Sequence, residues 1–309
     1  MAHNGADLLR RRCARLAAAV LVILASSRHP SVAQQPDLAA VLAQAAERAA
    51  ELSAPNRLLV CEEHYKQLLD RVRAIVGFDV GGPVGSRSEV APVGVDKREW
   101  IAELALFPTP GNAAEGLPWR EFRDIVSIDG VPHDDGAAQL SRLASVPADV
   151  AGVTALDISL GASAHMFGRL LRALDIPRAA QIFLHPSNQP RFEFKKGGQK
   201  TIAGVKTMEV KFRETSRPTI IRASGNGDAP SSGSFWIDPA TGDVLMSVLK
   251  SADSREISDE LTVTYERVPE LGLCLPATLT ERIVDDPAGQ RVQTSATFTK
   301  WRAVPRKQG

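Results

Sequence analysis

The residues best suited to chemistry in this sequence are Glu62, Glu63 and His64, a polar cluster inside a predicted strand. Successive strand residues point to opposite faces, so Glu62 and His64 share one side and Glu63 lies on the other. A carboxylate beside an imidazole can act in general acid–base catalysis if the pair faces a cleft, and is ordinary solvated surface if it does not. A hydrolase using Glu62 and His64, or His185 in the turn HPSNQP, is therefore one hypothesis.

Metal and cofactor sites have little to start from. Cys61 and Cys274 are 274 − 61 = 213 positions apart. No H-x-x-x-H spacing, which would suit a zinc site, occurs among the histidines His64, His133, His165 and His185. Ser247 and Lys250 match S-x-x-K, but on a predicted strand they point to opposite faces, whereas serine enzymes place this motif on a helix. We expect no metal and no cofactor, and we assign no catalytic residue.

The first 33 residues have the pattern of a secretory signal peptide. Arg10, Arg11, Arg12 and Arg15 precede the apolar run Leu16 to Ala25, and small residues end at Ala33. The alternative is an N-terminal membrane anchor. As a helix, however, ten apolar residues are about 15 Å long, which is too short to cross about 30 Å of membrane hydrocarbon. We expect cleavage near Ala33 and an exported protein, periplasmic or extracellular.

Removal of residues 1–33 changes the charge. This segment carries five Arg and one Asp, so the formal net charge falls from +1 to 1 − (5 − 1) = −3. Nucleic-acid binding requires a basic stripe, and the run Lys195-Lys196 looks like the flank of a turn. We expect no nucleic-acid partner.

Cys61 and Cys274 remain in the exported chain, each within a predicted strand. A disulfide between them is allowed in an oxidising compartment if the strands are adjacent, because the Cα atoms must lie within about 7 Å. Two separate buried thiols are the alternative.

The exported chain, residues 34–309, is predicted to be one domain. A helix is expected at 36–53 from its Ala, Leu and Glu content, and a flexible loop at 77–97 from its Gly and Pro content. Leucines three and four positions apart predict a helical lid at 134–175, ended by Pro177.

Strands account for most of the remainder. We predict a strand at 56–69, where Val60, Cys61 and Tyr65 favour a strand over the alternative of a helix, and strands at 99–107 and 120–128, the last leading into the turn Asp129-Gly130. Residues 178–302 are read as strand and turn throughout, an antiparallel meander with hairpin turns at 196–199, 238–242 and 286–289. Apolar and polar residues alternate in 206–213 and 261–266, which indicates one buried and one wet face.

A sheet of about ten strands curls or closes. Its concave apolar face needs a cover, and the predicted helices are the segments available. The predicted fold class is α+β, a strongly curved antiparallel sheet or incomplete β-barrel with helices over its concave face.

Two segments carry a family resemblance. The run Thr201 to Val210, followed by Phe235-Trp236-Ile237-Asp238-Pro239-Ala240-Thr241-Gly242 and a Pro-led strand at Pro276, resembles LolA-type periplasmic half-barrel proteins, the outer-membrane lipoprotein carriers and their relatives. The resemblance covers roughly residues 98 to 302 and implies a hydrophobic cavity between sheet and helices. The loop 77–97 and the lid are both longer than a minimal carrier needs.

Together these observations predict a non-enzymatic envelope protein that binds a lipid, acyl chain or other hydrophobic ligand. The expected partner is a hydrophobic small molecule or a lipidated protein, with peripheral membrane contact allowed. The hydrolase and an envelope scaffold that pairs through a sheet edge remain alternatives. The candidate cavity-lining residues are Met208, Val210, Phe212, Phe235, Ile237, Leu261, Val263, Tyr265 and Phe298.

Overall fold

The computed structural model describes residues 37–52, 57–71, 93–108, 119–133, 177–222, 227–252, 257–286 and 289–305. The predicted signal peptide at 1–33 and the predicted lid at 134–175 lie outside these residues. The helical elements in the described part are α2 (Leu38–Glu51) and two short 3₁₀ helices, η2 (Ala179–Leu184) and η3 (Gln189–Arg191). Helix α2 falls within the range 36–53 given for a helix.

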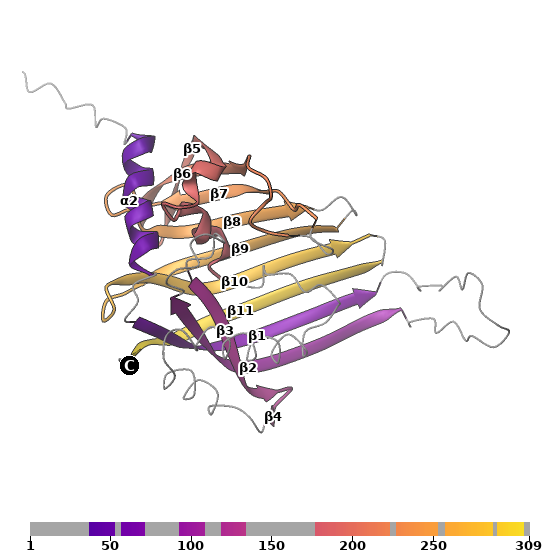
Figure 1. Cartoon of the computed structure of the whole chain (residues 1–309). Coiled ribbons are helices and arrows are strands. Elements are labelled where there is room, and N and C mark those ends of the chain that lie inside the picture. The colour runs from indigo at the N-terminus through magenta and orange to yellow at the C-terminus, as the bar shows by residue number, and fades with distance from the viewer. Residues whose placement is uncertain are drawn as a thin grey trace, which may run out of the picture. The chain divides into compact units, whose positions relative to one another are not determined.

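Eleven strands form one antiparallel sheet (Figure 1). They are β1 (Arg57–Arg71), β2 (Gly94–Pro108), β3 (Trp119–Ile128), β4 (Val131–Pro132), β5 (Phe192–Ile202), β6 (Val205–Glu214), β7 (Ser231–Ile237), β8 (Val244–Ala252), β9 (Ile257–Val268), β10 (Leu273–Asp285) and β11 (Gln290–Pro305). The order is β4-β3-β2-β1-β11-β10-β9-β8-β7-β6-β5, so β4 and β5 are edges and the sheet is open. The predicted incomplete antiparallel barrel of about ten strands is confirmed as an open eleven-stranded sheet.

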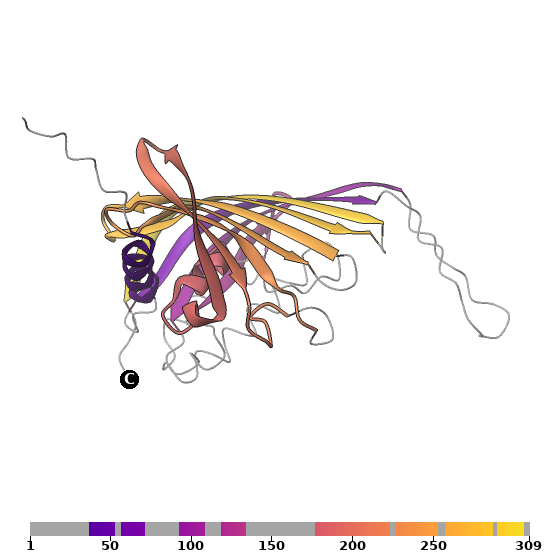
Figure 2. The same cartoon turned by 90° about the horizontal axis from the view of Figure 1, so that it is seen from above.

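The sheet has two distinct faces because side chains alternate along each strand. On β6, Met208, Val210 and Phe212 are buried, whereas Lys211 and Arg213, on the other side of the strand, are exposed. We call the first side the covered face and the second the outer face. Helix α2 and η2 lie on the same side of the sheet and contact each other (Figure 2), and η2 packs on β8.

Helix α2 is held against the turn between β7 and β8. Its buried residues Val41, Ala45 and Ala49 recur every four positions and make one apolar stripe. Gly242 in the turn has φ +76, and a Cβ there would lie 2.7 Å from the backbone carbon of Gln44. This approach explains why the turn sequence ends in glycine: only a residue without a side chain lets the helix sit so close.

The sheet curls enough to bring distant strands together. Strand β3 lies six places from β8 in the strand order. Nevertheless Trp119 of β3 lies 6.4 Å from His185, ring centre to ring centre, and the Arg178 guanidinium carbon is 5.4 Å from the Trp119 ring centre. Residues 178–185 include η2, which packs on β8. We call the region formed by α2, residues 177–185 and Trp119 the closed end.

Three local predictions are wrong. The segment 196–199 is not a hairpin turn but lies inside β5, where the register with β6 shifts, and the turn is at Ala203-Gly204, whose φ values of 47 and 82 are left-handed. Residues 94–97, predicted to be part of the loop 77–97, belong to β2. Of the rest of that predicted loop, residue 93 alone is among the described residues. Residues 177–191 are largely helical turns instead of strand.

The two cysteines do not form a disulfide. Cys61 is on β1 and Cys274 on β10, and β11 lies between these strands. Two strand spacings of about 4.8 Å exceed the Cα separation of about 7 Å that a disulfide allows. Both residues are buried thiols.

Candidate functional site

The nine residues predicted to line a cavity are brought together on the covered face. All nine are buried, and all belong to one apolar cluster. The strand register aligns the cluster in a continuous row across eight strands. The row runs from β2 to β6 through Trp100, Tyr65, Ala296, Leu279, Val263, Ser247, Phe235 and Val210.

Three of the nine are packed by residues 177–184. The Phe183 ring of η2 lies 5.5 Å from the Phe212 ring, which in turn stacks on Phe235 at 4.7 Å. The Tyr265 hydroxyl donates a hydrogen bond to the Pro177 carbonyl at 3.2 Å. Phe212, Phe235 and Tyr265 therefore form ordinary protein core at the closed end.

Little space is left at the closed end. A cavity of about 20 Å³ lies there, lined by residues that include Ala45, Arg178, Asp243 and Cys274. That volume is comparable to a single water site. Burial raises the pKa of the Cys274 thiol to about 11, so the thiol stays protonated and donates to the Val244 carbonyl at 3.3 Å. This part of the covered face cannot accept an acyl chain.

The middle of the covered face has a different composition. We use the name middle section for the covered-face residues of β1, β2, β9, β10 and β11 that lie beyond the closed end. Leu261, Val263 and Phe298 belong to it, together with Ala296 and Leu279. Their strands are joined directly by hydrogen bonding, so these buried side chains form one continuous apolar cluster.

Buried polar groups adjoin that surface. Glu63 of β1 is 0% exposed and accepts hydrogen bonds from Arg123 of β3, at 2.6 Å from Nε and 3.0 Å from Nη2. The same guanidinium lies 5.5 Å from the Tyr65 ring, and Tyr65 stacks on Trp100 at 3.8 Å. Within the described residues, the buried Trp100 Nε1 has no hydrogen-bond partner.

A polar row continues beside this cluster. Gln67, Thr294 and Glu281 are directly opposite one another on β1, β11 and β10, and all are buried. The Tyr65 hydroxyl and the Thr294 hydroxyl are 3.3 Å apart. Sequence reasoning missed this row, although a signal existed: in Leu279, Glu281 and Ile283 the acid occupies the same alternating phase as the buried apolar residues.

The predicted pair Glu62 and His64 does share one side, but that side is the outer face. His64 Nε2 lies 3.0 Å from Glu62 Oε1, and Lys300 Nζ lies 2.8 Å from the other carboxylate oxygen. The hydrogen bonds from Lys300 and His64 lower the pKa of Glu62, which therefore stays ionised. A groove of about 400 Å³ on the outer face is lined by His64 but not by Glu62. The geometry is that of a surface ion pair.

His185 is not brought to a carboxylate. Its Nδ1 lies 2.7 Å from the Ser187 hydroxyl, and its ring meets the edge of Trp119. Partial burial lowers the pKa of His185, which favours the neutral imidazole. The residue closes the end of η2 rather than completing a catalytic pair.

The described part of the chain offers neither a metal-binding cluster nor a membrane-spanning helix. It contains no group of three or more His, Cys, Asp or Glu side chains placed to hold a metal ion. It also contains no helix that is long and apolar enough to cross a membrane.

The chain matches no protein-family model and no curated protein. Similar solved structures include a domain assigned to outer-membrane lipoprotein sorting from Vibrio parahaemolyticus, 11% identical, with a TM-score of 0.33 over 85% of this chain and 91% of that one. A DUF1329 family protein from Desulfovibrio piger is 10% identical, with a TM-score of 0.31 over 84% and 92%. A LolA superfamily protein from Nitrosomonas europaea is 9% identical, with a TM-score of 0.31 over 87% and 94%. Function is therefore argued from this chain's own residues.

Proposed function

We propose that this chain is an exported cell-envelope protein that binds an amphiphile, such as a lipid or the acyl chain of a lipidated protein, on the middle section of its covered face. The observation that carries the proposal is the continuous apolar cluster there. Leu261, Val263 and Phe298 belong to it, whereas the described helices pack at the closed end. The N-terminal pattern of residues 1–33 supports export.

The buried polar groups fit the second half of an amphiphile. Acyl carbons on Val263 and Leu279 would be removed from water, at about 0.8 kcal/mol for each CH₂. The Trp100 indole N–H is a donor without a partner among the described residues, and a buried donor of this kind gains from an ester or amide carbonyl. A hydrocarbon without a polar group would leave that donor unsatisfied.

The direct test is extraction of protein purified from its own host. Native mass spectrometry should show an added mass, and organic extraction should release an amphiphile in about one-to-one amount with protein. Protein whose native mass equals that of the bare chain, and whose extract holds no amphiphile, would contradict the proposal.

A further inference from the structure

The strand at one edge of the sheet carries a concentration of positive charge. From Arg191 to Asp228 there are nine Lys or Arg and four Asp or Glu, a net charge of 9 − 4 = +5. The whole chain has a net charge of only +1. Strands β5 and β6 and the segment that follows them are therefore basic, and the rest of the protein is acidic.

The carboxylates of this segment are at least partly buried, whereas nearly all of its cations are exposed. None of the four acids is in the exposed class, but eight of the nine cations are, with Arg191 half-buried. Glu209 stabilises the register shift in β5. Its Oε2 accepts a hydrogen bond from the Gly198 N–H at 2.8 Å, and its Oε1 accepts one from the Ser234 hydroxyl at 2.9 Å.

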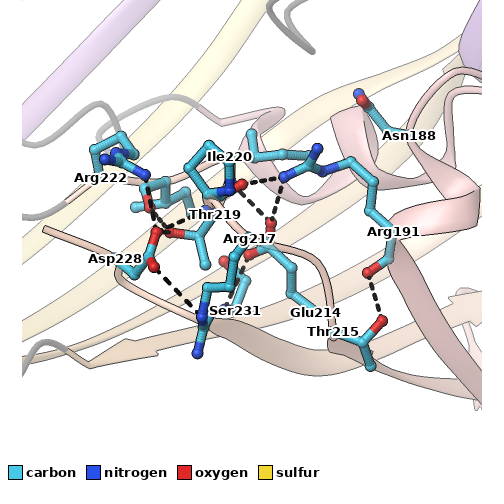
Figure 3. Close-up of polar contacts among 12 residues, drawn as sticks. Asn188, Arg191, Glu214, Thr215, Arg217, Thr219, Ile220, Arg222, Asp228 and Ser231 are labelled. Carbon is cyan, nitrogen blue, oxygen red and sulfur yellow. Dashed lines mark hydrogen bonds and ion pairs between the residues drawn. The ribbon is translucent and has the colours of Figure 1, made fainter. Parts of the chain in front are cut away.

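Two more acids hold the chain between β6 and β7 (Figure 3). Glu214 is buried and accepts the Ile220 N–H at 2.7 Å, and desolvation raises its pKa. Asp228 accepts the Thr219 N–H at 2.8 Å and pairs with Arg222. Glu193 then remains, and Lys195 and Arg213 both contact it, at 3.1 and 2.8 Å.

The arrangement of the lysines lowers the stability of the sheet, and packing alone does not explain it. Lys195 and Lys211 are directly opposite each other on β5 and β6. Like charges at directly opposed positions destabilise a sheet. The Lys195 side chain is 69% exposed and Lys211 is also exposed, so both charges face solvent.

An amphipathic aromatic side chain lies beside these cations. Trp236 of β7 is half-buried on the outer face, directly opposite Glu209 of β6. Lys200 Nζ lies 5.7 Å from the Trp236 ring centre. Tryptophan beside lysine is the combination found at the headgroup level of membranes, because the ring is apolar and its N–H is polar.

From these placements we infer that the β5–β6 edge is a docking surface for anionic lipid headgroups. The hairpin stands out from the plane of the neighbouring strands (Figure 2), so its cations can approach a flat surface together. Each Lys or Arg near an anionic membrane strengthens binding by about fivefold. An acidic protein is the competing partner, and Trp236 favours the lipid surface over it.

Co-sedimentation with vesicles tests the inference. The full exported chain should sediment with phosphatidylcholine vesicles that contain phosphatidylglycerol, and not with phosphatidylcholine alone, and added salt should release it. Replacing Lys195, Lys200, Lys206 and Lys211 by Gln should weaken binding by roughly two to three orders of magnitude, at about fivefold per residue.

The matched control removes four lysines that have acid partners. Both Lys66 and Lys97 contact Glu99, at 3.5 and 2.7 Å. The other two are Lys250, which contacts Glu260 at 2.8 Å, and Lys300, which contacts Glu62 at 2.8 Å. Replacing these four lysines by Gln changes the net charge by the same amount as in the first variant, but the protein should retain most of its vesicle binding. Equal loss in both variants, or wild-type protein that binds polyglutamate but not anionic vesicles, would overturn the inference. None of the eight lysines belongs to the middle section, so acyl binding should persist in both variants and is tested separately.

Discussion

The closed end and the middle section belong to the same covered face but are built differently. At the closed end, Phe183 reaches the sheet aromatics and the remaining cavity is about 20 Å³. In the middle section, the apolar row meets the Glu63–Arg123 ion pair and an indole N–H without a partner among the described residues. The closed end therefore serves stability, and the middle section is where we place the proposed binding.

The largest expected effect is at the closed end. Phe183 is 1% exposed and stacks on Phe192 at 4.6 Å. Phe183→Ala should lower the unfolding free energy by about 3 to 5 kcal/mol, because it removes a buried ring and leaves a cavity. Urea unfolding gives the measurement. Phe194→Ala, at a half-buried position on the edge strand, is the control and should cost clearly less. Equal losses of unfolding free energy in the two variants would show that the closed end contributes no more to stability than the edge strand.

A pair of neighbouring glutamates sharpens the contrast between the two faces. Glu63→Gln removes the carboxylate that the Arg123 guanidinium contacts in a nearly dry site, and we expect a loss of about 3 kcal/mol. Glu62→Gln weakens an ion pair with the exposed Lys300 and should cost less than about 1 kcal/mol. Chemical denaturation of both variants checks the difference. A larger loss for Glu62→Gln would mean that the faces are assigned the wrong way round.

The smallest expected effect concerns pH at the closed end. Desolvation lowers the pKa of His185 below 6.5, so the neutral ring is favoured in the folded state. The stabilising contribution is complete above pH 6.5 and is lost as the pH falls through the lowered pKa. His185→Gln should remove that part of the acid dependence, measured as the difference between the two proteins' unfolding free energies from pH 7.5 to 5. If the difference in unfolding free energy does not change with pH, His185 does not contribute to the acid dependence of stability.

The regular part of the fold could be predicted because alternation is local. Met208, Val210 and Phe212 alternate with charged residues in the sequence, and they alternate in the same way in β6. The 3₁₀ turns at 179–184 could not be predicted, because six residues give no helical period and their burial depends on β8 and Trp119. Tertiary packing, and not local propensity, determines that segment.

Three residues of the proposed site, Leu261, Val263 and Phe298, are among the nine named from the sequence. The nine apolar residues carried their own signal, but Glu63 gains its partner from Arg123, 60 positions away. The basic edge was missed for a similar reason. Lys195-Lys196 resembles the flank of a turn until the structure shows that Glu209 and Glu214 accept backbone N–H groups while the lysines are exposed.

Binding of a fluorescent fatty acid to two tryptophan variants tests the central claim most directly. Ala296 lies in the apolar row between Tyr65 and Leu279, and Thr297 is the next residue on the outer face. If the middle section accepts an acyl chain, Ala296→Trp should fold, fill that space and weaken binding by at least about tenfold, while Thr297→Trp binds like wild type. Unchanged binding by Ala296→Trp, or its failure to fold because the face is already packed solid, would contradict the account.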